Sequence, residues 1–147
     1  ELDCNCENNL ETFDCLGECG GTAIIDECGI CNGDNSTCTG CMIPQSDNYS
    51  PNFIFPDNEN CNIDYNSSIQ TILDNNCIAC HAGSSSINLE SFSNLMSGNI
   101  IIPGDSTNSI LWKVVSGNSN YPMPPSYKLD NSSIRKIALW IHFGATE

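Results

Sequence analysis

The chain has 147 residues and is strongly acidic, with 18 Asp and Glu against 4 Lys and Arg and a formal net charge of −14. Nucleic acids and anionic membranes are poor partners for such a chain, because proteins bind both through clustered Lys and Arg. No apolar run in the sequence is long enough to span a membrane.

The negative charge is concentrated in the first part of the chain. Residues 1–61 hold 12 of the acidic residues and no basic residue, whereas residues 62–147 hold the other 6 and all 4 basic residues. This contrast predicts two modules of different construction. We expect an acidic, disulfide-rich module over residues 1–61 and a second domain over residues 62–147.

The chain contains 11 cysteines, far more than is usual in the cytoplasm, and disulfides persist mainly outside that reducing compartment. It opens at Glu1 without a Met and shows no signal peptide, which fits a processed, secreted protein. We therefore expect an extracellular or cell-surface protein, with the periplasm as the other oxidising location.

Residues 1–40 have few apolar side chains, and glycines that favour tight turns flank their cysteines. Such a segment cannot bury enough apolar surface to fold unaided, so we expect cross-links or metal to hold it. Disulfides are the favoured interpretation, with a short hairpin around Thr22–Asp26. The competing interpretation is a zinc or iron site on Cys28, Cys31, Cys38 and Cys41, although the gap between its two C-x2-C pairs is short.

Calcium is a weaker prediction for the same segment. Asp26, Glu27 and Asp34 offer the oxygen ligands that this cation prefers, but no EF-hand spacing is present. Solvated acidic residues in turns are the favoured interpretation.

The stretch from Cys15 to Cys38 resembles the cysteine- and aspartate-rich repeats of secreted bacterial surface proteins, with the pattern CGG…DECGxCxGDNSxC. The stretch from Gly40 to Cys61 resembles a short secreted repeat that commonly follows them, with the pattern GC…NYxPxA…D…C. The second resemblance implies a disulfide between Cys41 and Cys61. Phe53 stands where that repeat usually has a small residue.

From about Asn62 onward the apolar residues follow helical spacing, and polar N-caps and glycines mark the expected helix ends. We expect helices from Asn66 or Ser67 to Ala82–Gly83, over Ser91–Met96, over Asn108–Val115, and from an Asp130 N-cap to about Phe143. Residues 100–104 should cross between helices as an extended strip. The domain is therefore predicted to be mainly α-helical.

Cys77-Ile78-Ala79-Cys80-His81 reads C-x-x-C-H, the sequence that attaches c-type haem. Cysteines three residues apart lie on one face of a helix, from which both sulfurs can bond a single porphyrin. His81 follows directly and can act as the proximal iron ligand. For the pentapeptide alone, the alternative is a structural disulfide or half of a metal site.

Tyr121-Pro122-Met123-Pro124-Pro125 is the second informative stretch. Three prolines fix the backbone around one methionine and deny it a helix or strand. The alternative is a surface turn, but beside C-x-x-C-H this loop predicts Met123 as the second axial ligand. Met42 in the cysteine module and Met96 in the core have no such setting.

His142 offers another candidate sixth ligand, either here or to haem in a neighbouring subunit. The favoured interpretation is an exposed residue near a helix end. Trp112, Trp140, Tyr121 and Tyr127 are expected to pack in the core and the haem pocket.

The second domain resembles small bacterial class I c-type cytochromes in four ordered motifs. These are Cys77–His81, Pro103-Gly104-Asp105 through Ser109-Ile110-Leu111, Pro122–Pro125, and the final Trp140-Ile141-His142-Phe143-Gly144-Ala145. The resemblance implies one covalent haem c, with thioethers at Cys77 and Cys80, a proximal His81 and a distal Met123. It also implies that the first and last helices pack crosswise.

A haem with His and Met ligands has no open iron position, so we expect electron transfer with redox partner proteins rather than enzymatic activity. A haem enzyme, or a gas- or peroxide-binding domain, is the alternative if Met123 does not bind. A third hypothesis is a filament of stacked haems, assembled through the cysteine module. With two cysteines on haem an odd number remains, and Cys4 and Cys6 are the expected places for the unpaired one.

Overall fold

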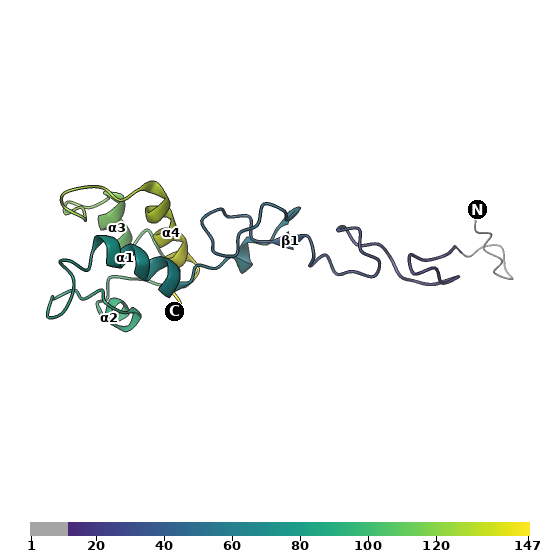
Figure 1. Cartoon of the computed structure of the whole chain (residues 1–147), viewed down its shortest axis with the longest axis horizontal. Helices are drawn as coiled ribbons and strands as arrows, with labels where there is room; N and C mark the ends of the chain where they lie inside the picture. The colour runs from purple at the N-terminus through teal and green to yellow at the C-terminus, as the bar shows by residue number, and fades with distance from the viewer. Residues whose placement is uncertain (1–11) are drawn as a thin grey trace.

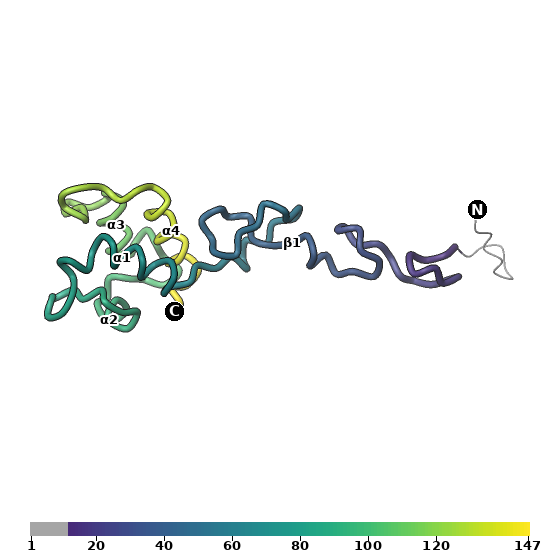
Figure 2. The backbone as a smooth tube through the Cα atoms, in the orientation of Figure 1, coloured from purple at the N-terminus to yellow at the C-terminus, as the bar shows by residue number. Residues whose placement is uncertain are grey.

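The computed structural model describes residues 12–147. A helical domain occupies one end of the molecule, and the cysteine-rich part of the chain extends away from it as an arm (Figure 1). The tube in Figure 2 shows that this arm is a succession of loops with little regular structure. The prediction of a mainly helical domain preceded by an irregular disulfide-rich segment is confirmed at this level.

The first helical segment consists of η2 (Tyr65–Gln70), a π-helical stretch, followed directly by α1 (Thr71–Asn76). Its N-cap is Asp64, whose carboxylate accepts a hydrogen bond from the Ser67 N–H at 2.6 Å. The predicted start at Asn66 or Ser67 is therefore slightly late. The predicted end at Ala82–Gly83 is wrong, because the backbone leaves helical geometry at Cys77 (φ −126°).

The other three helices lie within two residues of their predicted bounds. They are α2 (Phe92–Ser97), α3 (Ile110–Ser116) and α4 (Asn131–His142). Side chains of Ser91 and Asp130 cap α2 and α4, and α3 ends at Gly117 with a φ of 82°, which suits a glycine. No helix within residues 12–147 is long and apolar enough to cross a membrane.

The core of the helical domain forms where the first helical segment meets α4. Tyr65 of η2 and Phe92 of α2 pack edge-to-face with ring centroids 5.2 Å apart, and the Tyr65 and Trp140 centroids are 5.6 Å apart. The Tyr65 hydroxyl donates to Gln70, and burial raises the pKa of this tyrosine to about 12. The fully buried aliphatic residues of the core include Ile69, Leu73, Leu95, Ile137 and Ile141.

Disulfides rather than strands hold the arm. Within residues 12–147, disulfides join Cys15 to Cys31, Cys28 to Cys38 and Cys41 to Cys61, and Cys19 is also disulfide-bonded. The Cys41–Cys61 bridge confirms the pairing that the resemblance implied. The odd cysteine predicted at Cys4 or Cys6 lies outside the described residues.

The predicted hairpin around Thr22–Asp26 is wrong, because Ile25 forms only an isolated bridge with Cys31. Regular structure in residues 12–61 is confined to a short parallel pair, β1 (Thr39–Gly40) with β2 (Phe55–Pro56), and a 3-10 turn η1 (Asn58–Asn60). The Phe53 ring lies directly over Gly40, where a Cβ would come within 2.3 Å of it. This contact shows how the loop accommodates the unusual Phe53.

Asp47 joins the arm to the helical domain. Its carboxylate accepts hydrogen bonds from the Asp64 N–H at 2.7 Å, the Ser68 hydroxyl at 2.9 Å and the Lys136 ammonium at 2.8 Å. Partial burial opposes its ionisation, but these donors outweigh burial and hold the pKa of Asp47 below its ordinary value. One acidic side chain thus links the arm to both η2 and α4.

Candidate cofactor site

The C-x-x-C-H segment forms a tight turn immediately after α1. The Cys77 N–H still donates to Leu73 O at 2.7 Å, but the N–H groups of Cys80 and His81 both donate to Cys77 O, at 3.1 and 3.0 Å. This compact turn places Cys77, Cys80 and His81 along the wall of a single cavity. The sequence predicted their common face, and the structure forms it with a turn instead of a continuous helix.

The orientation of His81 leaves one ring nitrogen available as a ligand. Its Nδ1 lies 3.1 Å from Ile87 O. A carbonyl oxygen only accepts hydrogen bonds, so Nδ1 must carry the proton in this contact, and Nε2 of the neutral ring keeps its lone pair. A metal-bound histidine typically donates its other N–H to a carbonyl or carboxylate in this way.

Met123 reaches the same cavity from a distant loop. Its N–H donates to Val114 O of α3 at 2.9 Å, which ties the proline-rich loop to that helix. The Met123–Pro124 peptide bond is cis. The four predicted site residues, Cys77, Cys80, His81 and Met123, therefore line one cavity although they come from two separate segments of the chain.

The cavity has the size and polarity of a cofactor site. Its volume is about 400 Å³, and Cys77, His81 and Met123 also border a second cavity of about 130 Å³. Ligand sites usually measure roughly 300–1,000 Å³ and are mostly apolar. The wall of the second cavity is mostly apolar, and its aliphatic residues include Ile87, Leu89, Ile100, Leu111 and Val115. An apolar macrocycle with an iron at its centre fits these donors and walls.

The cysteines of the site are chemically distinct from those of the arm. Cys77 and Cys80 are both free thiols, whereas every described cysteine of the arm is disulfide-bonded. Burial raises the pKa of the Cys77 thiol. Although three residues apart on a tight turn, the two thiols remain unpaired, as a site for two thioether bonds requires.

A hydrogen bond across the mouth of the cavity was not predicted. The Tyr127 hydroxyl donates to Asn76 Oδ1 at 2.9 Å. Asn76 is the last residue of α1, and its Nδ2 donates to Ile72 O at 2.8 Å, which fixes the orientation of the amide. This bond ties the loop that carries Met123 to the residue before Cys77. No local signal marks such a pair, because the two residues lie 51 positions apart.

The other candidate residues lie elsewhere. His142 borders a separate groove between α4 and the arm, together with Ile43 and Glu59, and lines neither of the cavities that His81 borders. Met96 is partly buried against the core, and Met42 is exposed in the arm. Of His142 and Met123, only Met123 therefore shares a cavity with His81 among the described residues.

Neither alternative metal site finds support in the described arm. The four cysteines of the C-x2-C pattern are all in disulfides, Cys28 with Cys38 and the other two with Cys15 and Cys61. Residues 12–147 contain no group of three or more His, Cys, Asp or Glu side chains that could hold a metal ion. The calcium candidate Asp26 instead accepts hydrogen bonds from three backbone N–H groups.

Comparison with known proteins points to the same part of the chain. Residues 77–127 match a sequence family described as Planctomycete cytochrome C. The matched segment begins at Cys77 and ends at Tyr127, so it contains all four predicted site residues and the tyrosine at the mouth of the cavity. No curated protein and no solved structure matches the chain. The match supports a cytochrome c-like domain, as the sequence resemblance predicted.

Proposed function

We propose that this chain transfers single electrons through one covalently bound haem c, held by Cys77 and Cys80 and ligated by His81 and Met123. The observation that carries the proposal is the convergence of these four side chains on one cavity, from two segments of the chain. When bound, haem iron supplies a one-electron couple there. The chain's own residues would orient it and set its potential.

The two axial residues have complementary roles. His81 offers Nε2 while Ile87 O holds its Nδ1–H, so the ring is oriented for ligation. Met123 offers a soft, neutral thioether, which raises the potential relative to a second histidine. With both positions filled, no open iron position is left for a substrate. We therefore propose an electron carrier and not an enzyme.

The aliphatic wall and the mouth of the cavity have different roles: one excludes water and the other is open to a partner protein. Residues such as Leu89, Leu111 and Val115 exclude water from one side, and a dry surrounding favours the less charged iron state and raises the potential. On the other side, Tyr127 and Met123 lie at the surface. An exposed rim of this kind is where a redox partner protein could approach the haem.

The disulfides of the arm favour an oxidising location, either outside the cell or in the periplasm. Assembly into a haem-stacked filament stays a prediction, since Cys4 and Cys6 lie outside the described residues. Non-reducing electrophoresis and negative-stain microscopy of the purified protein test it. A protein that is monomeric under both would exclude the filament and leave the electron carrier in place.

The test of the proposal is a spectroscopic redox titration of the haem-loaded protein. We expect one reversible one-electron transition in the wild type. Met123→Leu should lower the potential, abolish the methionine–iron charge-transfer band at the red end of the spectrum and let the ferrous protein bind carbon monoxide. Met96→Leu, a core methionine outside both cavities, is the matched control and should change none of these properties.

Carbon monoxide binding and peroxide turnover separate the proposal from its main alternative. A wild-type ferrous protein that binds carbon monoxide without delay, and a ferric protein that turns over peroxide, would show an open distal site. That result would replace the electron carrier with a haem enzyme or a gas-binding domain.

A further inference from the structure

The arm contains two copies of one structural unit, residues 14–25 and residues 26–37. In the first copy, the Asp14 carboxylate accepts hydrogen bonds from the backbone N–H groups of Leu16, Glu18 and Ala23, at 2.9, 2.9 and 3.1 Å. These backbone bonds hold the pKa of Asp14 below its ordinary value. The carboxylate thus organises the whole loop around itself.

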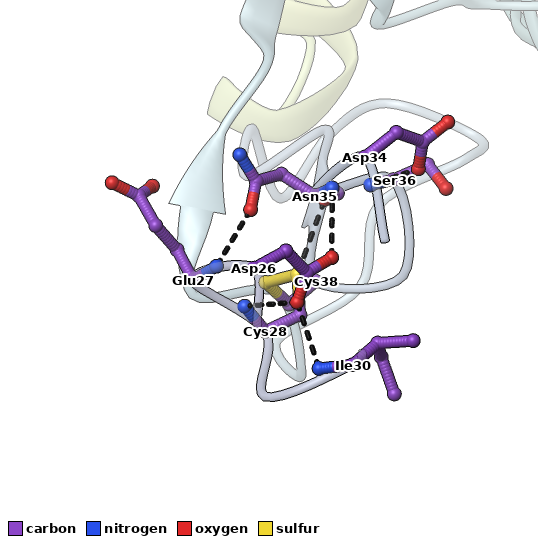
Figure 3. The surroundings of a disulfide bond; sticks show 8 residues. All are labelled: Asp26, Glu27, Cys28, Ile30, Asp34, Asn35, Ser36 and Cys38. Atoms are coloured by element: carbon purple, nitrogen blue, oxygen red, sulfur yellow. Dashed lines mark hydrogen bonds between the residues drawn. A yellow bond between two sulfur atoms is a disulfide. The ribbon is translucent and has the colours of Figure 1, made fainter. Parts of the chain in front are cut away.

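The second copy repeats this arrangement 12 residues later. Asp26 accepts from the N–H groups of Cys28, Ile30 and Asn35, at 2.9, 2.8 and 2.9 Å (Figure 3). The backbone hydrogen bonds of the aspartates repeat as well. Asp14 N donates to Glu18 O and Asp26 N donates to Ile30 O, each four residues later and each at 2.9 Å. The three backbone donors thus lie two, four and nine residues after the aspartate in both units.

The glycines of the two units are also equivalent. Gly17 and Gly29 share a φ of 83°, which non-glycine residues rarely adopt. At Gly21 and Gly33 a Cβ would lie 2.1 Å from Oδ2 of the unit's own aspartate. Each unit therefore requires one glycine for its turn and another for the close approach of its carboxylate.

Overlapping covalent links join the units to each other and to the next segment. Cys15–Cys31 connects the two units, and Cys28–Cys38 connects the second unit to the residue just before β1. Cys28 lies within the loop that Cys15–Cys31 closes, so this loop overlaps the loop that Cys28–Cys38 closes. The overlap leaves no hinge between the two loops that lacks a covalent link. The Cys41–Cys61 bridge then closes the segment whose Asp47 binds the helical domain.

The two units achieve this order without a hydrophobic core. Their apolar side chains Leu16, Ile24, Ile25 and Ile30 are all exposed. Cross-links and carboxylate-centred turns replace core packing, and the units follow one another along the extended arm (Figure 2). Such quasi-one-dimensional construction is typical of repeat proteins, whose length grows by whole units.

We infer that residues 12–61 form a rigid, extensible spacer that holds the helical domain at a fixed distance from the N-terminal end of the arm. Carboxylate-centred units set its length, and overlapping disulfides suppress bending between them. This function is separate from that of the cavity, because no residue of the arm lines it. The spacer determines how far the exposed rim of the cavity reaches toward a partner.

The test is a distance measurement between two spin labels in the full chain. Noncanonical amino acids at Thr12 and Ser132 carry the labels, since both positions are exposed and neither borders the cavities. We expect a narrow distance distribution. Inserting one extra copy of residues 14–25 after Ile25 preserves the 16-residue separation of the Cys15–Cys31 bridge, so equivalent cysteines can still pair.

Each inserted copy should lengthen the mean distance by the same increment, well below the ~40 Å that 12 fully extended residues could span. A Gly/Ser insertion of equal length should instead broaden the distribution. Gly33→Ala should also broaden it through the clash with Asp26, whereas Thr37→Ala, an exposed position in the same unit, should not. Mass spectrometry would verify that all variants keep the same arm disulfides.

A wild-type distribution as broad as that of the Gly/Ser variant would overturn the spacer. So would unequal increments for the first and second inserted copies. The labels report on the arm whether or not the cavity holds haem. Failure of the spacer is therefore distinguishable from failure of the proposed electron transfer.

Discussion

Removing the Tyr127 hydroxyl should weaken the binding of Met123 to the haem iron. Tyr127→Phe keeps the ring but deletes the 2.9 Å hydrogen bond to Asn76 Oδ1. Within residues 12–147, the backbone hydrogen bond from Met123 N–H to Val114 O then remains to hold the methionine against the helices. We therefore expect the loop to move away from α1 more often and to release the iron more readily.

The size of the effect follows from the exposure of the bond. A net neutral hydrogen bond contributes about 0.5–1.5 kcal/mol. Tyr127 is 51% exposed, so water can replace Asn76 in part, and the lower portion of the range applies, about 0.5–1 kcal/mol. That free energy corresponds to about a 2- to 5-fold shift between the bound and released states of Met123.

Imidazole titration of the ferric protein measures this shift, because imidazole competes with Met123 for the iron. The charge-transfer band of the methionine–iron bond reports the displacement. We expect Tyr127→Phe to lower the apparent Kd for imidazole by about 2- to 5-fold. Tyr121→Phe is the matched control: this tyrosine borders the adjoining cavity, is 78% exposed and has no hydroxyl hydrogen bond within residues 12–147, so it should leave the Kd unchanged.

An unchanged Kd in Tyr127→Phe, together with a lower thermal midpoint, would refute this reasoning, because the bond would then support only the fold. Asn76→Ala gives an independent check. Its effect on the Kd and that of Tyr127→Phe should not add in the double variant, since both delete the same bond.

Two further predictions concern stability. Asp47→Asn should reduce the free energy of unfolding by about 1–2 kcal/mol at pH 7, while Glu59→Gln, exposed in the same segment, should not. Folding lowers the pKa of Asp47, so this stabilisation is complete above the ordinary pKa of 3.8 and is lost as the pH falls through the folded value. In urea unfolding, the wild type and Asp47→Asn should therefore become equally stable in acid. Leu73→Ala should cost about 2–5 kcal/mol in urea unfolding, because the side chain is fully buried. Ile54→Ala, at a side chain that is 64% exposed, should stay within about 0.5 kcal/mol, and equal costs at the two sites would contradict the assigned core.

Local chemistry explains which parts of the helical domain the sequence could predict. Ser91 and Asp130 cap helices through their own side chains, and Gly117 ends one by its own backbone freedom, so each signal lies within a few residues of its effect. The C-x-x-C-H motif likewise carries its chemistry in five consecutive residues. The end of α1 was predicted too late, because the apolar spacing continues through a segment that folds as a turn.

The repeat in the arm escaped prediction because only one pair of its cysteines, Cys19 and Cys31, follows the period. Cys15 is equivalent to Glu27, and Cys28 is equivalent to Leu16, so cysteine spacing hides the 12-residue period that the aspartates and glycines keep. Contacts between distant residues had no sequence signal either. The bonds Tyr127–Asn76 and Asp47–Lys136 join positions 51 and 89 residues apart, and only the fold brings them together.

The mass of the purified protein after denaturation tests the central claim most directly. A thiol adds across a vinyl group without losing atoms, so Cys77 and Cys80 together should raise the mass of the chain by that of one whole haem. We expect this increase on the peptide that carries residues 77–81, with a pyridine haemochrome spectrum of the doubly thioether-linked type. A chain of unmodified mass after expression with a cytochrome c maturation system, with no haem absorbance, would contradict the account.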